Sequence, residues 1–267
     1  MNRNEQLIMK ALDQPDFIRL DLREEADSTN RIAKQMGQEG ASEGYLVIAD
    51  RQTAGRGRLG RSFSSPKGTG LYMSLLLRPD MPASEAVRIT AAAAVATAEA
   101  VNALSGAAAG IKWVNDLYLN GRKICGILTE SVLGNNGDRP DYAVLGIGVN
   151  VAEPDGGFDA SIADKAGAVF KRGQMPEGFR ERLAAEIVNR FLPYYRNLFG
   201  EELLKRYREW SILSGREVYV YRTFAEKEEG KLAEVLGIEA DFGLRVRFTD
   251  GTEEVLSTGE VSIRQKQ

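Results

Sequence analysis

The spacing of apolar and polar residues predicts a mixture of strands and helices along residues 1–151. Ile18, Leu20 and Leu22 alternate with charged residues, which is typical of a half-buried strand. Segments 45–50 and 70–77 are almost continuously apolar, which favours strands in the interior of a sheet. Helices are predicted over 4–13, after 27–30 and from 82 to about 104. A strand over 110–114 stops at Asn115-Asp116 and continues over 117–119, and two further strands are predicted over 123–132 and 142–151.

The pattern changes in the C-terminal part of the chain. Residues 151–175 are irregular and rich in Gly and Asp, and helices are predicted over 176–199 and 201–212. From Arg216 to Ile263, short alternating strands are separated by turns at Asp241-Phe242-Gly243 and Asp250-Gly251, which predicts a small β-barrel or roll. We therefore predict two domains, 1–213 and 214–267.

A loop of alternating glycine and arginine, 55–61, interrupts this apolar pattern between two predicted buried strands. Glycine lets backbone amides approach a ligand closely, and arginine supplies planar, permanently charged forks that fit carboxylate and phosphate oxygens. With Arg51 just upstream, four arginines surround this segment. Segment 52–70 is long for a connection inside a compact domain, and such loops are usually functional or mobile. We interpret the loop as a cradle for an anionic ligand; a solvated basic loop, or one that contacts nucleic acid, is the alternative.

The net charge of the chain favours a small anionic ligand over nucleic acid for this loop. The chain has 267 residues, a formal net charge of −3 and a pI of about 5.4. A protein whose main task is to grip DNA or RNA normally shows a basic face and a high pI, so a small anionic ligand suits the loop better. Cys125 is the single cysteine, and no apolar signal region or membrane-length apolar stretch is recognised, which together predict a cytoplasmic protein.

The chain contains no histidine. This excludes Ser-His-Asp and Cys-His catalysis, histidine metal sites and histidine general bases. Any chemistry must depend on arginine and lysine charges, carboxylates, backbone dipoles or a hard cation such as Mg²⁺.

Polar clusters follow several of the predicted strands, where α/β sheets normally bind ligands. Asp116 and Lys123 flank an Asn120-Gly121 hairpin signal on its two strands, so they are candidates to face one pocket. The simpler alternatives are a turn-forming aspartate and an exposed hairpin lysine, and spacing alone favours them. For the cluster 27–30, spacing likewise favours helix capping over ligand binding.

One reaction needs no general base. An ionised carboxylate that attacks the α-phosphate of ATP requires positioning and cations for the developing charge, which the arginines, a lysine and a carboxylate with Mg²⁺ would supply. The GxxxxGK[ST] phosphate loop is absent, so the chain is not a P-loop enzyme.

Several motifs, taken in order, resemble the biotin protein ligase family. They lie at 27–30, 52–61, 112–116 with 121–128, 146–150 and 257–262. The resemblance implies an α+β catalytic domain whose mixed sheet and helices are similar to class II aminoacyl-tRNA synthetases and lipoate ligases, followed by a C-terminal SH3-like β-barrel. It implies ATP-dependent formation of biotinyl-5′-AMP and transfer of biotin to a lysine of the biotin carboxyl carrier protein of acetyl-CoA carboxylase or a related carboxylase.

The resemblance also implies roles for individual residues. The catalytic residues it implies are Lys123, Arg58 and Asp116, with Asp116 the candidate for binding Mg²⁺ or for orienting the incoming lysine. The residues that it implies contact biotin are Ser28, Thr29, Asn30, Gln52, Gly55, Arg56, Gly57, Arg58, Lys123 and Gly126. The residues that it implies contact ATP or the adenylate are Arg56, Arg58, Arg61, Phe63, Asn115 and Asn150. The chain departs from the family pattern at Val114, where proline is usual, and at Phe63, where tryptophan is usual.

Other functions of the same fold remain alternatives. A lipoate or octanoate ligase is the nearest, and the Gly-Arg loop favours biotin over it. A biotinyl-AMP-responsive regulator would need a DNA-binding domain, for which fewer than about twenty residues precede the first predicted strand; we therefore expect the monofunctional type, without DNA or membrane partners. The resemblance is also compatible with a homodimer. A plain interaction module would leave the Gly-Arg loop unexplained.

Overall fold

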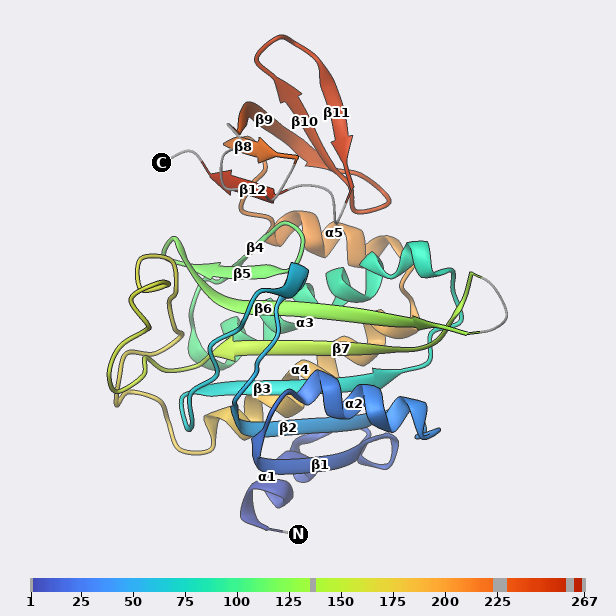
Figure 1. Ribbon diagram of the computed structural model, residues 1–267, viewed down its shortest axis with the longest axis vertical. Helices are drawn as coiled ribbons and strands as arrows, with labels where there is room; N and C mark the ends of the chain where they lie inside the picture. The colour runs from blue at the N-terminus through green and yellow to red at the C-terminus, as the bar shows by residue number, and fades with distance from the viewer. Residues whose placement is uncertain (1, 135–137, 223–229, 258–261, 266–267) are drawn as a thin grey trace.

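The computed structural model describes residues 2–134, 138–222, 230–257 and 262–265. Its main feature is a seven-stranded mixed sheet with helices on both faces (Figure 1). The strands are β1 (Arg19–Ala26), β2 (Tyr45–Gln52), β3 (Gly70–Leu77), β4 (Gly110–Lys112), β5 (Asp116–Leu119), β6 (Arg122–Leu133) and β7 (Pro140–Asn150). The order across the sheet is β1-β2-β3-β7-β6-β5-β4. The α+β class expected from the sequence is confirmed at this level.

Strand β3 shows why the sheet forms where it does. All eight of its residues are buried, and it pairs antiparallel with β2 on one side and β7 on the other. A strand buried on both faces reads as a continuous apolar run, so the interior position predicted for 70–77 is confirmed. Between β1 and β2 the pairing is parallel, and the connection between them is the helix α2 (Thr29–Gln38).

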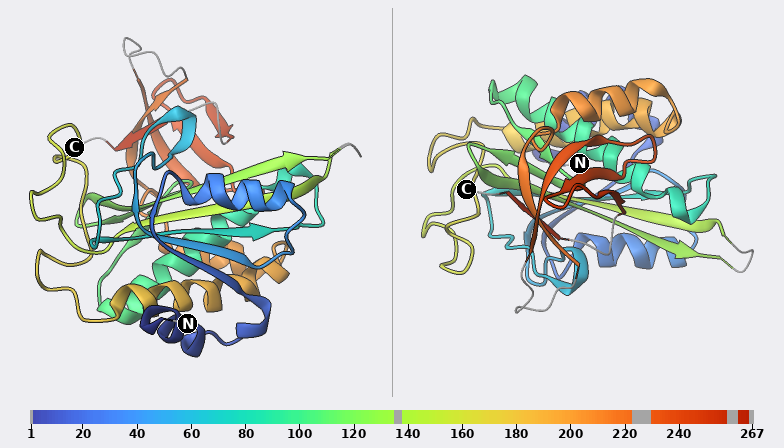
Figure 2. Two further views of the ribbon diagram at one scale, coloured as in Figure 1. Left: turned by 60° about the horizontal axis from the view of Figure 1, so that its bottom comes forward. Right: turned by 90° about the horizontal axis from the view of Figure 1, so that it is seen from above.

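The two faces of the sheet are covered differently (Figure 2). Helix α2 packs on β2, β3 and β7 from one side. On the other side lie α3 (Val87–Ser105) and α4 (Phe179–Arg196), while α1 (Arg3–Ala11) packs on α4 and α5 (Glu201–Trp210) packs on α3. The face with α2 is therefore covered over only part of its length, which leaves room for a site beside the N-terminus of that helix.

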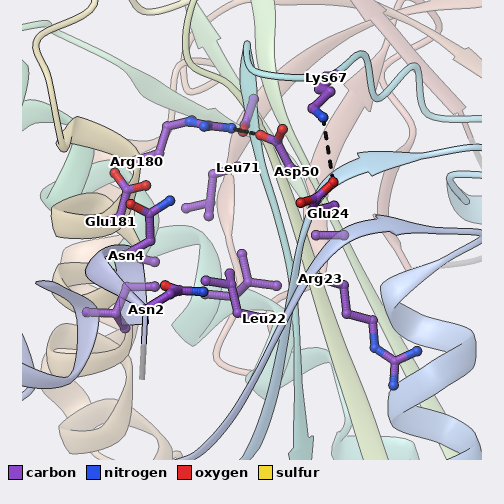
Figure 3. A pocket seen from close by; sticks show the side chains of 15 residues that line it. Asn2, Asn4, Leu22, Arg23, Glu24, Asp50, Lys67, Leu71, Arg180 and Glu181 are labelled. Carbon is purple, nitrogen blue, oxygen red and sulfur yellow. Dashed lines mark hydrogen bonds and ion pairs between the residues drawn. The ribbon is translucent and has the colours of Figure 1, made fainter. Parts of the chain in front are cut away.

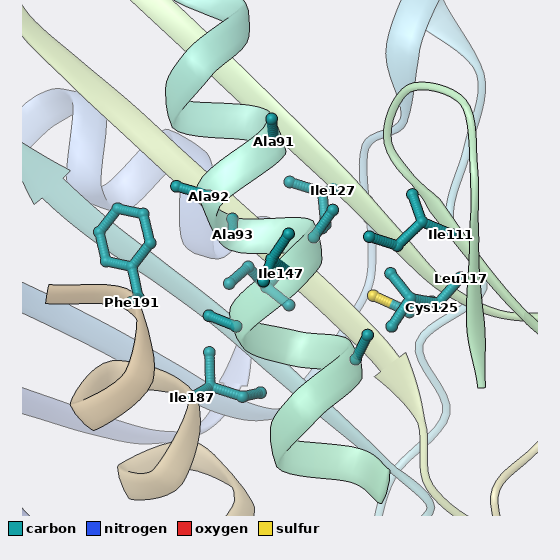
Figure 4. Packing of buried hydrophobic residues seen from close by; sticks show 14 of the residues in the cluster. Ala91, Ala92, Ala93, Ile111, Leu117, Cys125, Ile127, Ile147, Ile187 and Phe191 are labelled. Carbon is teal, nitrogen blue, oxygen red and sulfur yellow. The ribbon is translucent and has the colours of Figure 1, made fainter. Parts of the chain in front are cut away.

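Helix α3 forms the centre of the core. Residues 89–101 are all buried, and its alanines pack against Ile127 and Ile147 of the sheet and against Ile187 and Phe191 of α4 (Figure 4). Small side chains allow this close approach of helix and sheet. The segment Ala83–Ser105 is long and apolar enough to cross a membrane by length and composition. The expectation that no stretch approaches such a length is therefore wrong; the buried packing accounts for the apolar composition.

Glu99 is the charged residue within the buried stretch 89–101 of this helix. Its carboxylate accepts hydrogen bonds from Arg206 Nε at 2.9 Å and from the Tyr194 hydroxyl at 3.2 Å, and Arg190 lies 3.6 Å away. A buried charge is tolerated when it is paired and hydrogen-bonded. Glu99 thus joins α3 to α4 and α5.

The hairpin between β5 and β6 forms as predicted, but the strand before it does not. Asn120 and Gly121 have φ values of 51° and 76°, as a type I′ turn requires. A strand over 110–114 was expected to stop at Asn115-Asp116 and to continue over 117–119, whereas the chain reverses at 113–115 so that β4 and β5 pair antiparallel. Distant groups hold this turn: the Tyr207 hydroxyl donates to Val114 O, and Trp113 Nε1 donates to Phe242 O. Such contacts leave no local signal in the sequence.

The C-terminal region is a five-stranded antiparallel sheet at one end of the molecule (Figure 1). Its turns at Phe242 and Gly251 have positive φ, at the positions where turns were predicted. Its strands are β8 (Glu217–Tyr221), β9 (Lys231–Ile238), β10 (Leu244–Phe248), β11 (Glu253–Leu256) and β12 (Ser262–Gln265), in the order β11-β10-β9-β8-β12. Most of the motif at 257–262, namely 258–261, lies outside the described residues.

The single cysteine, Cys125, is fully buried in β6. Burial raises the pKa of its thiol well above the ordinary value. It behaves as a small apolar core residue, as the sequence predicts.

Candidate active site

A cavity of about 1230 Å³ lies on the α2 face of the seven-stranded sheet. It is bordered by the N-terminus of α2, the Gly-Arg loop, β5 to β7 and one strand of the C-terminal sheet. This is larger than most single-ligand pockets and offers room for two ligands side by side. The predicted site residues that line it are Ser28, Thr29, Asn30, Gln52, Arg56, Gly57, Arg58, Arg61, Phe63, Asn115, Asp116, Lys123, Gly126 and Asn150.

Three consecutive polar residues at the start of α2 are buried at one end of the cavity. Ser28, Thr29 and Asn30 are 2%, 3% and 5% exposed. Ser28 occupies the N-cap position, but its side chain makes no capping hydrogen bond. Capping alone therefore does not account for this cluster.

A hydrogen-bond network fixes these side chains. Gln52 Oε1 accepts from the backbone N of Thr29 at 2.9 Å and from its hydroxyl at 3.1 Å. Asn30 Nδ2 donates to Glu130 Oε2 at 2.8 Å, and Ser74 Oγ donates to Asn30 Oδ1 at 2.6 Å. Because Thr29 and Asn30 are held from β2, β3 and β6, this end of the cavity presents a rigid, polar wall. Ser74 and Glu130 were not recognised from the sequence; neither lies within a recognisable motif.

We expect Ser74→Ala to lower the free energy of unfolding by about 1–3 kcal/mol, because Asn30 Oδ1 loses its partner in a buried position. Urea denaturation followed by circular dichroism measures this. Ser131→Ala is the matched control, since the hydroxyl of Ser131 is a buried group without a hydrogen-bond partner among the described residues, and its removal should be neutral or stabilising. Equal losses in the two variants would contradict the network.

The Gly-Arg loop folds into a tight turn rather than an irregular segment. Phe63 N donates to Gly55 O at 2.9 Å, and Gly57 N donates to Arg61 O at 2.7 Å. Leu59, at the tip, has a φ of 58° and is 54% exposed. A β-carbon on Gly55 would lie 2.3 Å from Phe63 O, so close backbone approach explains this glycine. Gly55 is not among the residues that line the cavity, and its contact with a ligand stays a prediction.

The arginines of this region have different surroundings. Arg58 is largely buried, its Nη1 donates to Asn115 Oδ1 at 3.1 Å, and burial lowers the pKa of its guanidinium. Arg56 pairs with Glu130 at 3.0 Å, and Arg61 is exposed at the cavity edge. Arg51 points elsewhere and pairs with Glu25 at 3.1 Å. Three of the four arginines, not all four, therefore face the cavity.

Phe63 lies over the sheet at the centre of the cavity. β-Carbons on Gly148 and Gly126 would lie 2.7 Å and 3.2 Å from its ring, so these two glycines provide the flat surface on which the ring rests. The ring also meets Tyr72 edge to face, with centroids 6.5 Å apart. The position suits stacking against a planar ligand group.

Lys123 and Asp116 form the central ion pair. Lys123 Nζ lies 2.6 Å from Asp116 Oδ1, and the side chains are 33% and 24% exposed. The antiparallel pairing of β5 with β6 brings them together across the hairpin, the arrangement for which the sequence made them candidates. A cation and a carboxylate in contact can orient and neutralise an anionic reactant that enters between them.

Magnesium was expected near Asp116. Among the described residues no group of three or more acidic, cysteine or histidine side chains is placed to hold a metal ion. Asp116 alone can supply one carboxylate oxygen, which fits Mg²⁺ only when substrate phosphates provide further ligands. The residues thus fit an ion that arrives with a nucleotide, not a resident metal.

Two segments reach the cavity without having been predicted. Residues from 158 to 166 line one side and are joined to β6, where Lys123 N donates to Lys165 O and Gly167 N donates to Lys123 O, each at 2.8 Å. Tyr219 and Tyr221 come from β8 of the C-terminal sheet. The alternation of tyrosine and valine over 219–221 is the signal that was available, but it did not indicate which way the strand would face.

A second, smaller cavity of about 310 Å³ lies between α1, α4 and strands β1 to β3 (Figure 3). Two pairs of opposite charge border it: Arg180 pairs with Asp50, and Lys67 lies 3.9 Å from Glu24. None of the predicted site residues lines it. It is therefore separate from the candidate active site.

Comparisons with known proteins agree with this geometry. The model of the biotin/lipoate A/B protein ligase family matches residues 23–150. The biotin--[acetyl-CoA-carboxylase] ligase of Mycobacterium tuberculosis is 30% identical over 253 residues, covering 91% of this chain and 88% of that protein. The bifunctional ligase/repressor BirA of Bacillus spizizenii is 42% identical over 139 residues, which cover 52% of this chain and 42% of the relative's length.

A solved structure gives the same picture for the fold. The biotin protein ligase from Aquifex aeolicus in complex with biotin and ATP superposes with a TM-score of 0.74 at 26% identity, covering 93% of this chain and 99% of that one. Both parts of the chain, the large sheet with its helices and most of the C-terminal region, therefore fall within the matched length.

Proposed function

The chain belongs to the biotin protein ligase family, and we propose that it is an ATP-dependent biotin–protein ligase. In the first step, a biotin carboxylate oxygen bonds to the α-phosphorus of ATP while the bond to the β-phosphate breaks, which gives biotinyl-5′-AMP and pyrophosphate. In the second, a lysine amine of a biotin carboxyl carrier protein attacks the acyl carbon, AMP leaves and the amine loses a proton. The observation that carries the proposal is a single cavity that joins a buried polar wall to a cluster of cations.

The polar wall at the start of α2 suits the ring system of biotin. Ser28, Thr29, Asn30 and Gln52 offer hydroxyl and amide groups that match a cyclic urea, which has both donors and acceptors. Since hydrogen bonds already hold Thr29, Asn30 and Gln52 in place, these side chains lose little conformational entropy on binding. The Gly-Arg loop, with Arg56 and Gly57, lies next to this wall and would cover the ligand.

The cations lie where charge would develop. Lys123 and Arg58 border the same part of the cavity, with Asp116 in contact with Lys123 and close enough to raise the pKa of Arg58 against the effect of burial. Preorganised cations stabilise the charge on a transferring phosphoryl group without a general base. This explains how a chain with no histidine could catalyse adenylation.

The nucleotide would lie across the sheet from the polar wall. Phe63 offers a ring for stacking, and Asn115, Asn150 and Arg61 border the same region. Asn150 is itself fixed, because its Nδ2 donates to Gly167 O at 3.0 Å. Mg²⁺ would accompany the phosphates, with Asp116 as the carboxylate available to it.

Two finer features of the fold belong to the same proposal. We assign residues 1–213 to a catalytic domain similar to class II aminoacyl-tRNA synthetases, and 214–267 to an SH3-like barrel. The assignment is supported by the family relationship and by the change in architecture between α5 and β8.

Labelling of an acceptor tests the function. Purified protein with Mg·ATP and biotin should attach biotin to a carboxyl carrier domain, and an acceptor whose target lysine is replaced by arginine should stay unlabelled. Lipoate and octanoate serve as competing acids. Release of pyrophosphate with either of them but not with biotin would show that the substrate assignment is wrong.

Limited proteolysis should reveal closure of the Gly-Arg loop. At biotin and ATP concentrations about ten times their dissociation constants, the population with the loop open falls about tenfold, and trypsin cleavage after Arg56, Arg58 and Arg61 should slow accordingly. Cleavage after the exposed Arg3, remote from the cavity, is the internal control and should be unchanged. If the three loop sites are cleaved as fast with ligands as without, the loop is not a lid.

A further inference from the structure

Phe242 occupies an unusual position in the turn between β9 and β10. It is 1% exposed and has a φ of 64°, in the left-handed region that favours glycine. A bulky residue is rarely held there unless its surroundings compensate for the strain. The glycine that would satisfy the backbone lies one position later, at Gly243. The ring of Phe242 must therefore do something at this place that a glycine could not.

The contacts of Phe242 lead out of its own sheet. Its carbonyl oxygen accepts a hydrogen bond from Trp113 Nε1 at 2.8 Å. Its ring meets the ring of Tyr207 edge to face, with centroids 5.3 Å apart and an interplanar angle of 86°. The hydroxyl of Tyr207 in turn donates to Val114 O at 3.0 Å. Phe242 thus holds two successive residues of the turn at 113–115. Its backbone carbonyl holds Trp113 directly, and its ring holds Val114 through Tyr207 of α5.

The same turn carries a group that faces the cavity. Asn115 Nδ2 donates to Ile127 O at 2.8 Å and the backbone O of Asn115 accepts from Ile127 N at 2.9 Å, which fixes the amide on the sheet side. Asn115 Oδ1 then accepts from Arg58 Nη1 at 3.1 Å. The next residue is Asp116, the partner of Lys123. The turn is therefore clamped between the sheet on one side and Phe242 with Tyr207 on the other.

We propose that Phe242 is a positioning residue for adenylation, through which the C-terminal sheet sets the placement of Asn115 and Arg58. The proposal rests on the proposed function. Because Phe242 does not line the cavity, it acts only through the turn. Its loss should affect the nucleotide end of the site and spare the polar wall at α2, since no hydrogen bond among the described residues joins this turn to Ser28, Thr29 or Asn30.

Phe242→Gly removes the ring while allowing the positive φ, and it provides the main test. A misplacement of catalytic groups by about 1 Å can lower a rate about 100-fold, and we expect kcat/KM for ATP in pyrophosphate exchange to fall about 10- to 100-fold, with the affinity for biotin unchanged. Arg208→Ala is the matched control. Arg208 also joins α5 to the C-terminal sheet, through Nε and Nη2 bonds to Ile238 O at 2.9 Å and 2.6 Å, but it does not contact the turn.

Tryptophan emission gives a readout that does not depend on activity. Trp113 and Trp210 are the two tryptophans of the chain, so Trp210→Phe leaves Trp113 as the single reporter. In that background Phe242→Gly should shift the emission of the buried indole to the red, and Arg208→Ala should not. If the unmodified protein does not adenylate biotin, the proposed function fails, while this emission still reports whether Phe242 holds the turn.

If Phe242→Gly does not fold, a milder variant tests the positioning role of Phe242 instead. Tyr207→Phe removes only the hydroxyl that donates to Val114 O. We expect it to change the emission of Trp113 and lower kcat/KM for ATP in the same direction, to a smaller extent. Unchanged kinetics and emission in Phe242→Gly, or in Tyr207→Phe where that is the folded variant, would overturn the proposal, as would an equal kinetic loss in Arg208→Ala.

Discussion

Lys123→Ala is expected to lower kcat for biotin-dependent pyrophosphate exchange by about 100- to 1,000-fold, the loss seen when one preorganised donor to a developing charge is removed. The ammonium group of Lys123 is 2.6 Å from Asp116 and borders the cavity at the place proposed for the reacting carboxylate and phosphate. Arg58, the other cation proposed at this place, is engaged with Asn115 and is not free to replace it. The loss should appear in kcat, since the charge that it stabilises is greatest in the transition state.

The same substitution should hardly affect folding. Both partners of the Lys123–Asp116 pair are partly exposed, and pairs of this kind contribute about 1 kcal/mol or less. Lys205→Ala removes a lysine from the exposed pair with Glu202 on α5 and is the control for the loss of one positive charge. Wild-type exchange rates in Lys123→Ala, or an equal decrease in Lys205→Ala, would show that Lys123 has no role in adenylation.

Arg58→Ala should lower kcat/KM for ATP by about 100-fold. Burial lowers the pKa of this guanidinium and the nearby Asp116 raises it, and an arginine stays charged at neutral pH under either influence. Arg58→Lys keeps a positive charge but loses the planar fork, so we expect an intermediate rate. Single-turnover measurements with labelled ATP separate the binding step from the chemical step.

Arg51→Ala is the control that the chain itself provides for Arg58. Arg51 belongs to the same basic segment, but it pairs with Glu25 outside the cavity. Its removal changes the net charge by the same amount and should leave the exchange rate unaltered. Equal losses in Arg51→Ala and Arg58→Ala would mean that the overall charge of the segment, not the placement of Arg58, matters.

Features set by neighbouring residues were predictable from the sequence. The apolar run over 70–77 identified β3, and Asn120-Gly121 identified the hairpin that pairs Asp116 with Lys123. The reversal at 113–115 was not predictable, because the groups that hold it come from Tyr207 and Phe242, 93 and 129 residues along the chain from their partners. The local sequence does not distinguish a strand from a turn here, because the groups that hold the turn are so distant along the chain.

The site shows the same division. The motifs supplied most of the residues that the sheet brings to one cavity, but they did not supply their supports. Ser74 is a serine in an otherwise apolar strand, and Glu130 lies beyond the hairpin motif. Their importance arises from the register of β3, β7 and β6, which places both next to Asn30. For Gly55 the structure adds a reason that the motif did not contain, since the backbone of Phe63 lies too close for any side chain at this position.

The burial of Cys125 has a practical consequence for spectroscopy. The chain has no other cysteine, and this thiol is fully enclosed with a raised pKa, so maleimides and similar reagents should leave the native protein unlabelled. A cysteine introduced by Leu59→Cys at the exposed tip of the Gly-Arg loop would then be the one reactive thiol. A fluorophore attached there would follow the opening and closing of the loop in single molecules, without prior removal of any natural cysteine.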